Sequence, residues 1–158
     1  MRMKRFVAVT ILCFTAMVPV CSQAKLIKNF DQLMFGLRTG SEVRAVIFYA
    51  RCKLVVDSIE TKAPDAVGGM SFNTFEYYAQ NSIRNPKAFV TTSQMTLIAH
   101  PRQGHVYSYT KIKIFEDNDV EINTKYLIPT THQVVMDETF YGKVSSGDDG
   151  NAVCLYER

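Results

Sequence analysis

The chain has 158 residues, 47% of them hydrophobic and 21% charged, and its formal net charge is +3 at pH 7. This length suits one domain that buries a core of its own. Three of the 18 basic residues, Arg2, Lys4 and Arg5, lie at the N-terminus, and the rest of the chain carries 15 basic and 15 acidic residues. This balance lacks the basic footprint of a nucleic-acid-binding protein, so we predict no nucleic-acid partner.

Residues 1–24 have the pattern of a secretory signal peptide. The three basic residues precede an apolar run over residues 6–20, and Ser22 and Ala24 place small residues before a cleavage site after Ala24. The apolar run is too short to cross a bilayer, and no later stretch is long enough. We therefore expect an exported protein, periplasmic or secreted, whose mature part is a single domain over residues 25–158 without a transmembrane segment.

A short helix followed by a strand is predicted at the start of the mature chain. Asn29 is a suitable N-cap, Gln32 completes a capping-box pattern, and Gly40 can adopt the left-handed conformation that ends a helix. The apolar residues between them recur at helical spacing: Phe30, Leu33, Met34 and Leu37. Residues 43–49 are then nearly all apolar, which predicts a strand covered on both faces, one of them by the helix.

The clearest hairpin lies within residues 106–128. Its two runs, 106–114 and 120–128, alternate apolar and polar residues, and an odd-numbered loop would place both apolar sets on one face. Further strands are predicted from β-branched and aromatic residues at 89–99, 133–136 and 152–156. Residues 70–78 could form a helix or a strand, and their Phe, Tyr and Thr content favours the strand. Short connections favour antiparallel pairing. The predicted fold is α+β and mostly β, an antiparallel meander of six to eight strands with one N-terminal helix packed on it.

Two cysteines, Cys52 and Cys154, remain after the signal peptide. In an oxidising compartment an even pair predicts a disulfide, and two buried free thiols are the alternative. The α-carbons of a disulfide lie within about 7 Å of each other, so this bond would bring the last strand back to the strand at 43–49. The sheet would then either close into a barrel or fold over on itself.

His100 and His105 are the candidates for a zinc or copper site, because they flank the turn at Pro101–Gly104. Zinc needs at least three protein ligands, and no third ligand can be identified in the sequence. We therefore predict no metal and no cofactor. The acidic segments 116–119 and 148–151 match the composition of turns and not the spacing of a calcium loop.

A candidate binding face alternates aromatic and basic residues along the first strand of the hairpin: Tyr107, Tyr109, Lys111 and Lys113. Such a face could bind a sugar, an acidic ligand or a protein partner, although a solvated sheet face is the plainer interpretation. The sequence contains no nucleophile elbow, H-E-x-x-H motif, phosphate-binding glycine loop or C-x-x-C motif. We therefore predict no catalytic residue.

Eight positions of the mature chain form a further pattern, an F-x-x-L-x-x-x-L-x-x-G-x-x-V run, a strand ending in cysteine and a glycine pair. They are Phe30, Leu33, Leu37, Gly40, Val43, Cys52, Gly68 and Gly69. This pattern resembles the VirK family, small exported proteins of Gram-negative bacteria associated with virulence regulons. The resemblance implies export and a link to host interaction, but no catalytic residue, cofactor or defined ligand.

We therefore expect an exported, virulence-associated accessory or binding protein that catalyses no reaction. Its partner would be a host protein, an envelope protein or a small ligand. Two alternatives stay open. A small β-barrel carrier of a lipophilic ligand would need an internal apolar cavity. A hydrolase with an unrecognised carboxylate site would need two buried carboxyl groups that converge in a cleft.

Overall fold

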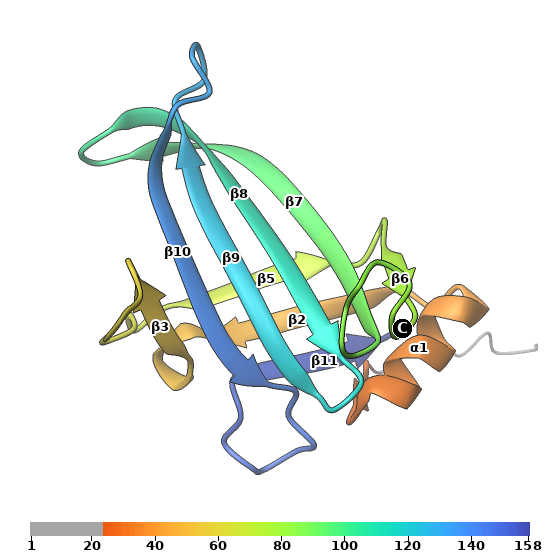
Figure 1. Cartoon of the computed structure of the whole chain (residues 1–158). Helices are drawn as coiled ribbons and strands as arrows, with labels where there is room; N and C mark the ends of the chain where they lie inside the picture. Colours follow the sequence, from red (N-terminus) through yellow and green to blue (C-terminus); the bar gives the residue numbers. More distant parts are fainter. Residues whose placement is uncertain (1–23) are drawn as a thin grey trace, which may run out of the picture.

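The computed structural model describes residues 24–158 as two antiparallel sheets packed face to face, with one helix beside them (Figure 1). Apart from Ala24, the predicted signal peptide lies outside the described residues. In chain order the elements are β1 (Lys25–Ile27), α1 (Phe30–Thr39), β2 (Val43–Phe48), a 3-10 turn (Tyr49–Arg51), β3 (Lys53–Val56), β4 (Ile59–Thr61), β5 (Val67–Ser71), β6 (Glu76–Tyr78), β7 (Phe89–His100), β8 (Gly104–Phe115), β9 (Asp119–Leu127), β10 (Val134–Lys143) and β11 (Val153–Glu157). The predicted class, mostly antiparallel β with one helix, is confirmed.

The smaller sheet has the order β1-β11-β2-β5. Its last strand in sequence, β11, lies between β1 and β2, with Leu155 opposite both Ile27 and Ala45. The last strand therefore does return to the strand at 43–49. Within the described residues the result is two open sheets packed face to face, and neither a closed barrel nor one continuous folded sheet.

The larger sheet has the order β4-β3-β10-β9-β8-β7-β6, so that β7 to β10 form a meander of successive hairpins. The β8–β9 loop, residues 116–118, has the predicted odd length, and Ile114 faces Val120 while Ile112 faces Ile122. Together the two sheets have eleven strands, more than the six to eight predicted. The difference comes mainly from β1, β4 and β6, which have three residues each and are too short to show a period.

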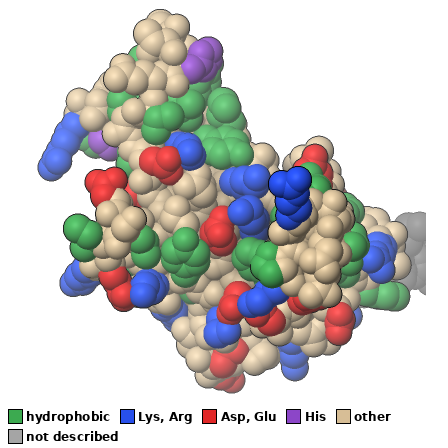
Figure 2. All heavy atoms as spheres, viewed as in Figure 1, with side chains coloured by type: hydrophobic (Ala, Val, Ile, Leu, Met, Phe, Trp, Pro, Cys, Tyr) green, Lys and Arg blue, Asp and Glu red, His purple; other side chains and the backbone are tan. Residues whose placement is uncertain are grey.

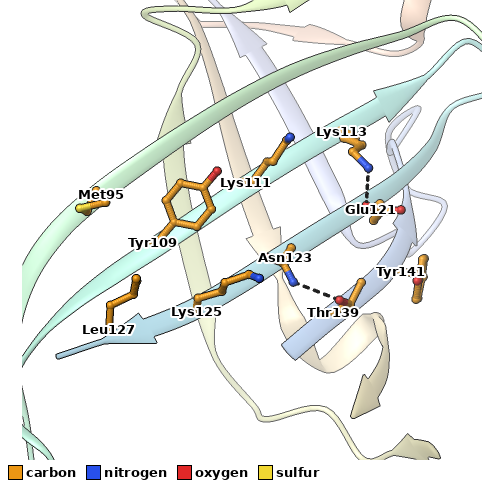
Figure 3. A pocket seen from close by; sticks show the side chains of 10 residues that line it. All are labelled: Met95, Tyr109, Lys111, Lys113, Glu121, Asn123, Lys125, Leu127, Thr139 and Tyr141. Carbon is orange, nitrogen blue, oxygen red and sulfur yellow. Dashed lines mark hydrogen bonds and ion pairs between the residues drawn. The ribbon is translucent and has the colours of Figure 1, made fainter. Parts of the chain in front are cut away.

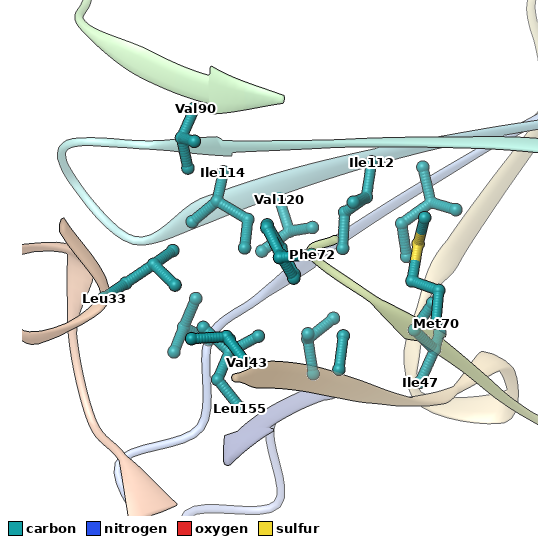
Figure 4. Packing of buried hydrophobic residues seen from close by; sticks show 14 of the residues in the cluster. Leu33, Val43, Ile47, Met70, Phe72, Val90, Ile112, Ile114, Val120 and Leu155 are labelled. Atoms are coloured by element: carbon teal, nitrogen blue, oxygen red, sulfur yellow. The ribbon is translucent and has the colours of Figure 1, made fainter. Parts of the chain in front are cut away.

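The core lies between the two sheets and is filled by apolar side chains from both (Figure 4). In β2 the alternation of the strand turns Val43, Ala45 and Ile47 into this core, whereas Arg44 is exposed. The prediction that this strand is covered on both faces is therefore wrong, because the smaller sheet has its second face toward solvent. The helix instead packs at one end of the sheets, and its Leu33 is fully buried in the shared core (Figures 1 and 4).

The long strands of the larger sheet extend beyond the smaller sheet (Figure 1). Along β7, Val90 is fully buried on the face toward the core, but Gln94 and Thr96 on the same face are exposed. The sequence changes with the burial, from apolar to neutral polar side chains. The middle of this inner face is thus accessible surface, between the core and the fully buried Val106 near the β7–β8 turn.

The helix begins and ends at the predicted caps. The Asn29 side chain accepts a hydrogen bond from the Gln32 backbone N–H at 2.9 Å, and Gly40 has a φ of 83°. A second asparagine, Asn118 of the β8–β9 loop, accepts the backbone N–H of Phe30 at 2.7 Å. Because the first N–H groups of a helix have no partner inside it, this bond ties the helix to the larger sheet.

Replacing Asn118 should separate two contributions to stability. Asn118 also has a φ of 66°, a left-handed conformation that glycine adopts freely and alanine does not. Asn118→Gly loses only the bond to Phe30 and should lower the free energy of unfolding by about 1–3 kcal/mol. Asn118→Ala adds backbone strain and should cost about 1–2 kcal/mol more. Urea denaturation of both variants measures the difference, and equal losses would contradict a left-handed Asn118.

The predicted disulfide between Cys52 and Cys154 is not formed, because both are free cysteines. Cys52 is buried on the core side, and a side chain at Gly142 would lie 3.5 Å from its Sγ. Cys154 lies between the fully buried Val153 and Leu155 in β11, so the alternation of the strand turns it to the opposite face of the smaller sheet. The disulfide was predicted from the even number of cysteines and the expected oxidising compartment. It cannot form because the two side chains lie on opposite faces of the smaller sheet.

Intact mass should therefore show two alkylated thiols when the unreduced protein is denatured and labelled. In the native protein Cys52 should react far more slowly than Cys154. Burial restricts access to the Cys52 thiol and raises its pKa, which lowers the thiolate fraction at neutral pH. If the denatured protein showed no added label, the two cysteines would be bonded to each other and the predicted disulfide would be correct.

Candidate functional site

A groove of about 630 Å³ lies on the outer face of the larger sheet, away from the core (Figure 3). We call it the Tyr–Lys groove. It is lined by residues of β7 to β10, namely Met95, Tyr109, Lys111, Lys113, Glu121, Asn123, Lys125, Leu127, Thr139 and Tyr141. In Figure 2 basic and acidic side chains are interspersed across the middle of this face.

The alternation of β8 produces this groove. Ile112 and Ile114 point into the core, so Tyr109, Lys111 and Lys113 project from the opposite face. The structure thus brings together three of the four residues of the predicted binding face. The fourth, Tyr107, lies nearer the β7–β8 turn, where its ring stacks on His132 with centroids 6.5 Å apart.

Two of the three lysines in the groove are held by carboxylates. Lys113 pairs with Glu121 and Lys125 pairs with Asp137, both at 2.8 Å. The hydrogen bond from Lys125, and after it one from Asn123, lowers the pKa of Asp137. The Lys125–Asp137 pair therefore contributes its stability at neutral pH, and that contribution is lost as the pH falls through the lowered pKa.

Lys111 is different, because none of the ion pairs among residues 24–158 involves it. It lies between Tyr109 and Lys113 on β8, and Figure 3 shows its amino group projecting over the sheet. A second hollow of about 320 Å³, between β6, β7 and β8, is also lined by Tyr109 and Lys111. Lys111 is therefore a half-buried cation shared by two adjoining hollows.

The wall of the groove toward β10 is fixed by hydrogen bonds. The Asn123 amide donates to Asp137 Oδ1 at 2.8 Å and to Thr139 Oγ1 at 3.2 Å. These bonds join β9 to β10 on the outer face, beside the two lysine pairs. A side chain held in this way loses little freedom when a ligand arrives, which favours binding.

The two candidate metal ligands lie on opposite faces of the larger sheet. His105 is opposite Ala99 across the β7–β8 pairing, so it shares the face of Ala99 and not that of the adjacent His100. The Nδ1 of His100 instead accepts the backbone N–H groups of Arg102 and Gln103, at 3.3 and 3.2 Å. Within residues 24–158 no three potential ligands gather.

The family-pattern residues build the structure and do not line the Tyr–Lys groove. Most are buried in the core, and Gly40 ends the helix. Gly68 is needed for packing, since a Cβ there would lie 2.9 Å from Cε2 of Tyr49. These positions therefore identify the fold and leave the binding chemistry unspecified.

Several groove residues were missing from the predicted binding face. Glu121 and Asn123 follow from the same alternation that identified Lys111, one strand further along. Thr139 and Tyr141 could not be anticipated, because the predicted strand at 133–136 is only the first part of β10. Met95 depends on the register between β7 and β8, which the sequence does not specify.

Together the fold and groove define a small two-sheet β protein with an open groove on the outer face of its larger sheet. The VirK protein family model matches residues 26–132, and the chain belongs to this family. The fold is similar to the crystal structure of lpg1832, a VirK family protein from Legionella pneumophila, with 14% sequence identity and a TM-score of 0.62, covering 82% of this chain and 97% of that one. No curated protein matches the chain. In the part of the chain that the structure describes, no helix could span a membrane.

Proposed function

We propose that this VirK-family chain is an exported, virulence-associated binding protein without catalytic activity, and that the Tyr–Lys groove binds an acidic oligosaccharide. The observation that carries the proposal is Lys111, a cation without an ion-pair partner among the described residues, at the centre of a built groove. Family membership and the N-terminal sequence pattern support export and the link to virulence.

The chemistry of the groove favours an acidic sugar. A carboxylate or sulfate near Lys111 would gain a charge-assisted hydrogen bond without breaking an existing ion pair. Tyr109 and Tyr141 offer aromatic surface for the apolar face of a sugar ring, and Tyr141 is 43% exposed. A volume of about 630 Å³ lies within the usual range of small-ligand sites.

The alternative functions receive less support from the geometry. The space between the sheets is filled by the hydrophobic cluster, which argues against a carrier with a ligand in its interior. The buried polar residues of the described chain are Thr91, Thr92 and Ser145, none of which is a carboxylate. The core therefore offers no support for a hydrolase with a buried pair of carboxylates.

The test is a binding screen of the folded chain against matched neutral and acidic oligosaccharides. Acidic members should bind more tightly, and binding should weaken as salt is added. Lys111→Ala should weaken the binding of the acidic members by about ten- to a hundredfold, the range expected for one hydrogen bond to a charged group. Lys62→Ala is the control, because it removes the same kind of side chain from an exposed position that lies outside the groove. Equal binding of neutral and acidic members, or equal effects of the two variants, would refute the proposal.

A further inference from the structure

β5 forms one edge of the smaller sheet, and no strand pairs with its outer side. The backbone N–H of Phe72 donates to Val43 O, and that of Tyr49 donates to Ala66 O, so even-numbered residues of this segment bond to β2. Antiparallel pairing alternates, and the N–H and C=O groups of Val67, Gly69 and Ser71 therefore point to the open edge. The edge presents main-chain donors and acceptors that await a partner strand.

The other three sheet edges in the described chain carry charged residues. β1 has Lys25, β4 has Glu60 and β6 has Glu76. Charges of this kind discourage pairing with a further strand. The sequence of β5 is Val-Gly-Gly-Met-Ser, which contains neither a charge nor a proline. Among these edges β5 alone lacks the usual protection.

A slot of about 180 Å³ lies between β5 and the part of the larger sheet that extends past it. From β5 it is lined by Gly68, Gly69 and Met70. From β7 and β8 it is lined by neutral polar side chains, namely Gln94, Thr96, Ser108 and Thr110. The slot offers hydrogen bonds and no charge.

We propose that β5 accepts an extended peptide as a fifth strand of the smaller sheet, under the overhanging half of the larger sheet. The peptide backbone would pair with Val67, Gly69 and Ser71. Its side chains toward the slot would be short and uncharged, Ser, Thr or Asn, because they meet amide and hydroxyl groups in a small space. This site is on the inner face of the larger sheet and is separate from the Tyr–Lys groove.

The test uses seven-residue peptides, acetylated and amidated, that alternate Val with Ser, Thr or Asn. Hydrogen exchange at Val67, Gly69 and Ser71 should be fast in the free protein and should slow at least tenfold when a binding peptide is added. The same peptide methylated at alternate backbone nitrogens keeps its side chains but cannot pair with β5. It should bind at least tenfold more weakly.

Two variants at neighbouring positions locate the site on the protein. Thr96→Trp should fill the slot and abolish peptide binding, whereas Leu97→Trp, on the opposite face of the same strand, should leave it unchanged. Equal binding of the methylated peptide, or a panel in which no peptide slows exchange in β5, would overturn the proposal. So would protected β5 amides in a free protein that sediments as a dimer, which would assign the edge to a second copy of the chain.

Discussion

Phe140→Ala should lower the free energy of unfolding by about 3–5 kcal/mol, as expected when a large buried aromatic is removed from a packed core. Phe140 is only 3% exposed and lies in β10 between Leu54 of β3 and Ile122 of β9. Its ring also packs edge-on against Tyr49, with centroids 4.8 Å apart. The cavity left by alanine would therefore border β3, β9 and the 3-10 turn that carries Tyr49. Urea denaturation followed by circular dichroism measures the loss.

Tyr141→Ala is the control for Phe140→Ala. Tyr141 is the next residue of β10, is also aromatic and points to the outer face, where it is 43% exposed. Because it leaves no core cavity, its loss should be smaller by at least about 2 kcal/mol. Equal losses at the two positions would mean that β10 does not have the alternation seen here.

Leu155→Ala should lower the free energy of unfolding by about 2–5 kcal/mol. Leu155 is fully buried in β11, the strand that returns to join β1 and β2. The smaller sheet has no other strand between β1 and β2, so weaker packing of β11 loosens both of its neighbours. The midpoint of thermal unfolding should fall accordingly.

The adjacent Cys154→Ala provides the comparison within the same strand. Cys154 is half-buried on the outer face of the smaller sheet and forms no disulfide. We expect it to cost less than Leu155→Ala by at least about 1 kcal/mol. A larger loss for Cys154→Ala would place its side chain in the core and would revive the predicted bond to Cys52.

The parts of the fold that could be predicted are those with local signals. Asn29, Gln32 and Gly40 define the helix through groups within a few residues, and the structure confirms both of its ends. The hairpin between β8 and β9 follows from alternation and loop parity alone. These features depend on near neighbours in sequence, which is why single-sequence reasoning reaches them.

The division into two sheets depends on contacts between distant residues. β1 has three residues and exists because β11, more than 120 residues later, pairs with it. The return of β11 was inferred from a disulfide that does not form, and the backbone pairing of β11 with β2 accomplishes the same return. The conclusion about topology was right although its chemical reason was wrong.

The candidate site was predicted in part for the same reason. Alternation along one strand placed Tyr109, Lys111 and Lys113 together, and the structure agrees. Whether each lysine forms an ion pair depends on neighbouring strands, since Glu121 lies on β9 and Asp137 on β10. Only the paired sheet shows that Lys111 is the one without such a partner within residues 24–158.

The most direct test of this account is to map where an acidic oligosaccharide binds. The isotope-labelled chain is titrated with the tightest acidic member of the screen, and backbone amide shifts are followed by NMR. We predict that the largest shifts will fall in β8 and β9 around Lys111 and Asn123, and that they will vanish in Lys111→Ala. Saturable shifts confined to another surface, with no change in the amide shifts of the Tyr–Lys groove, would contradict the assignment of this groove as the binding site.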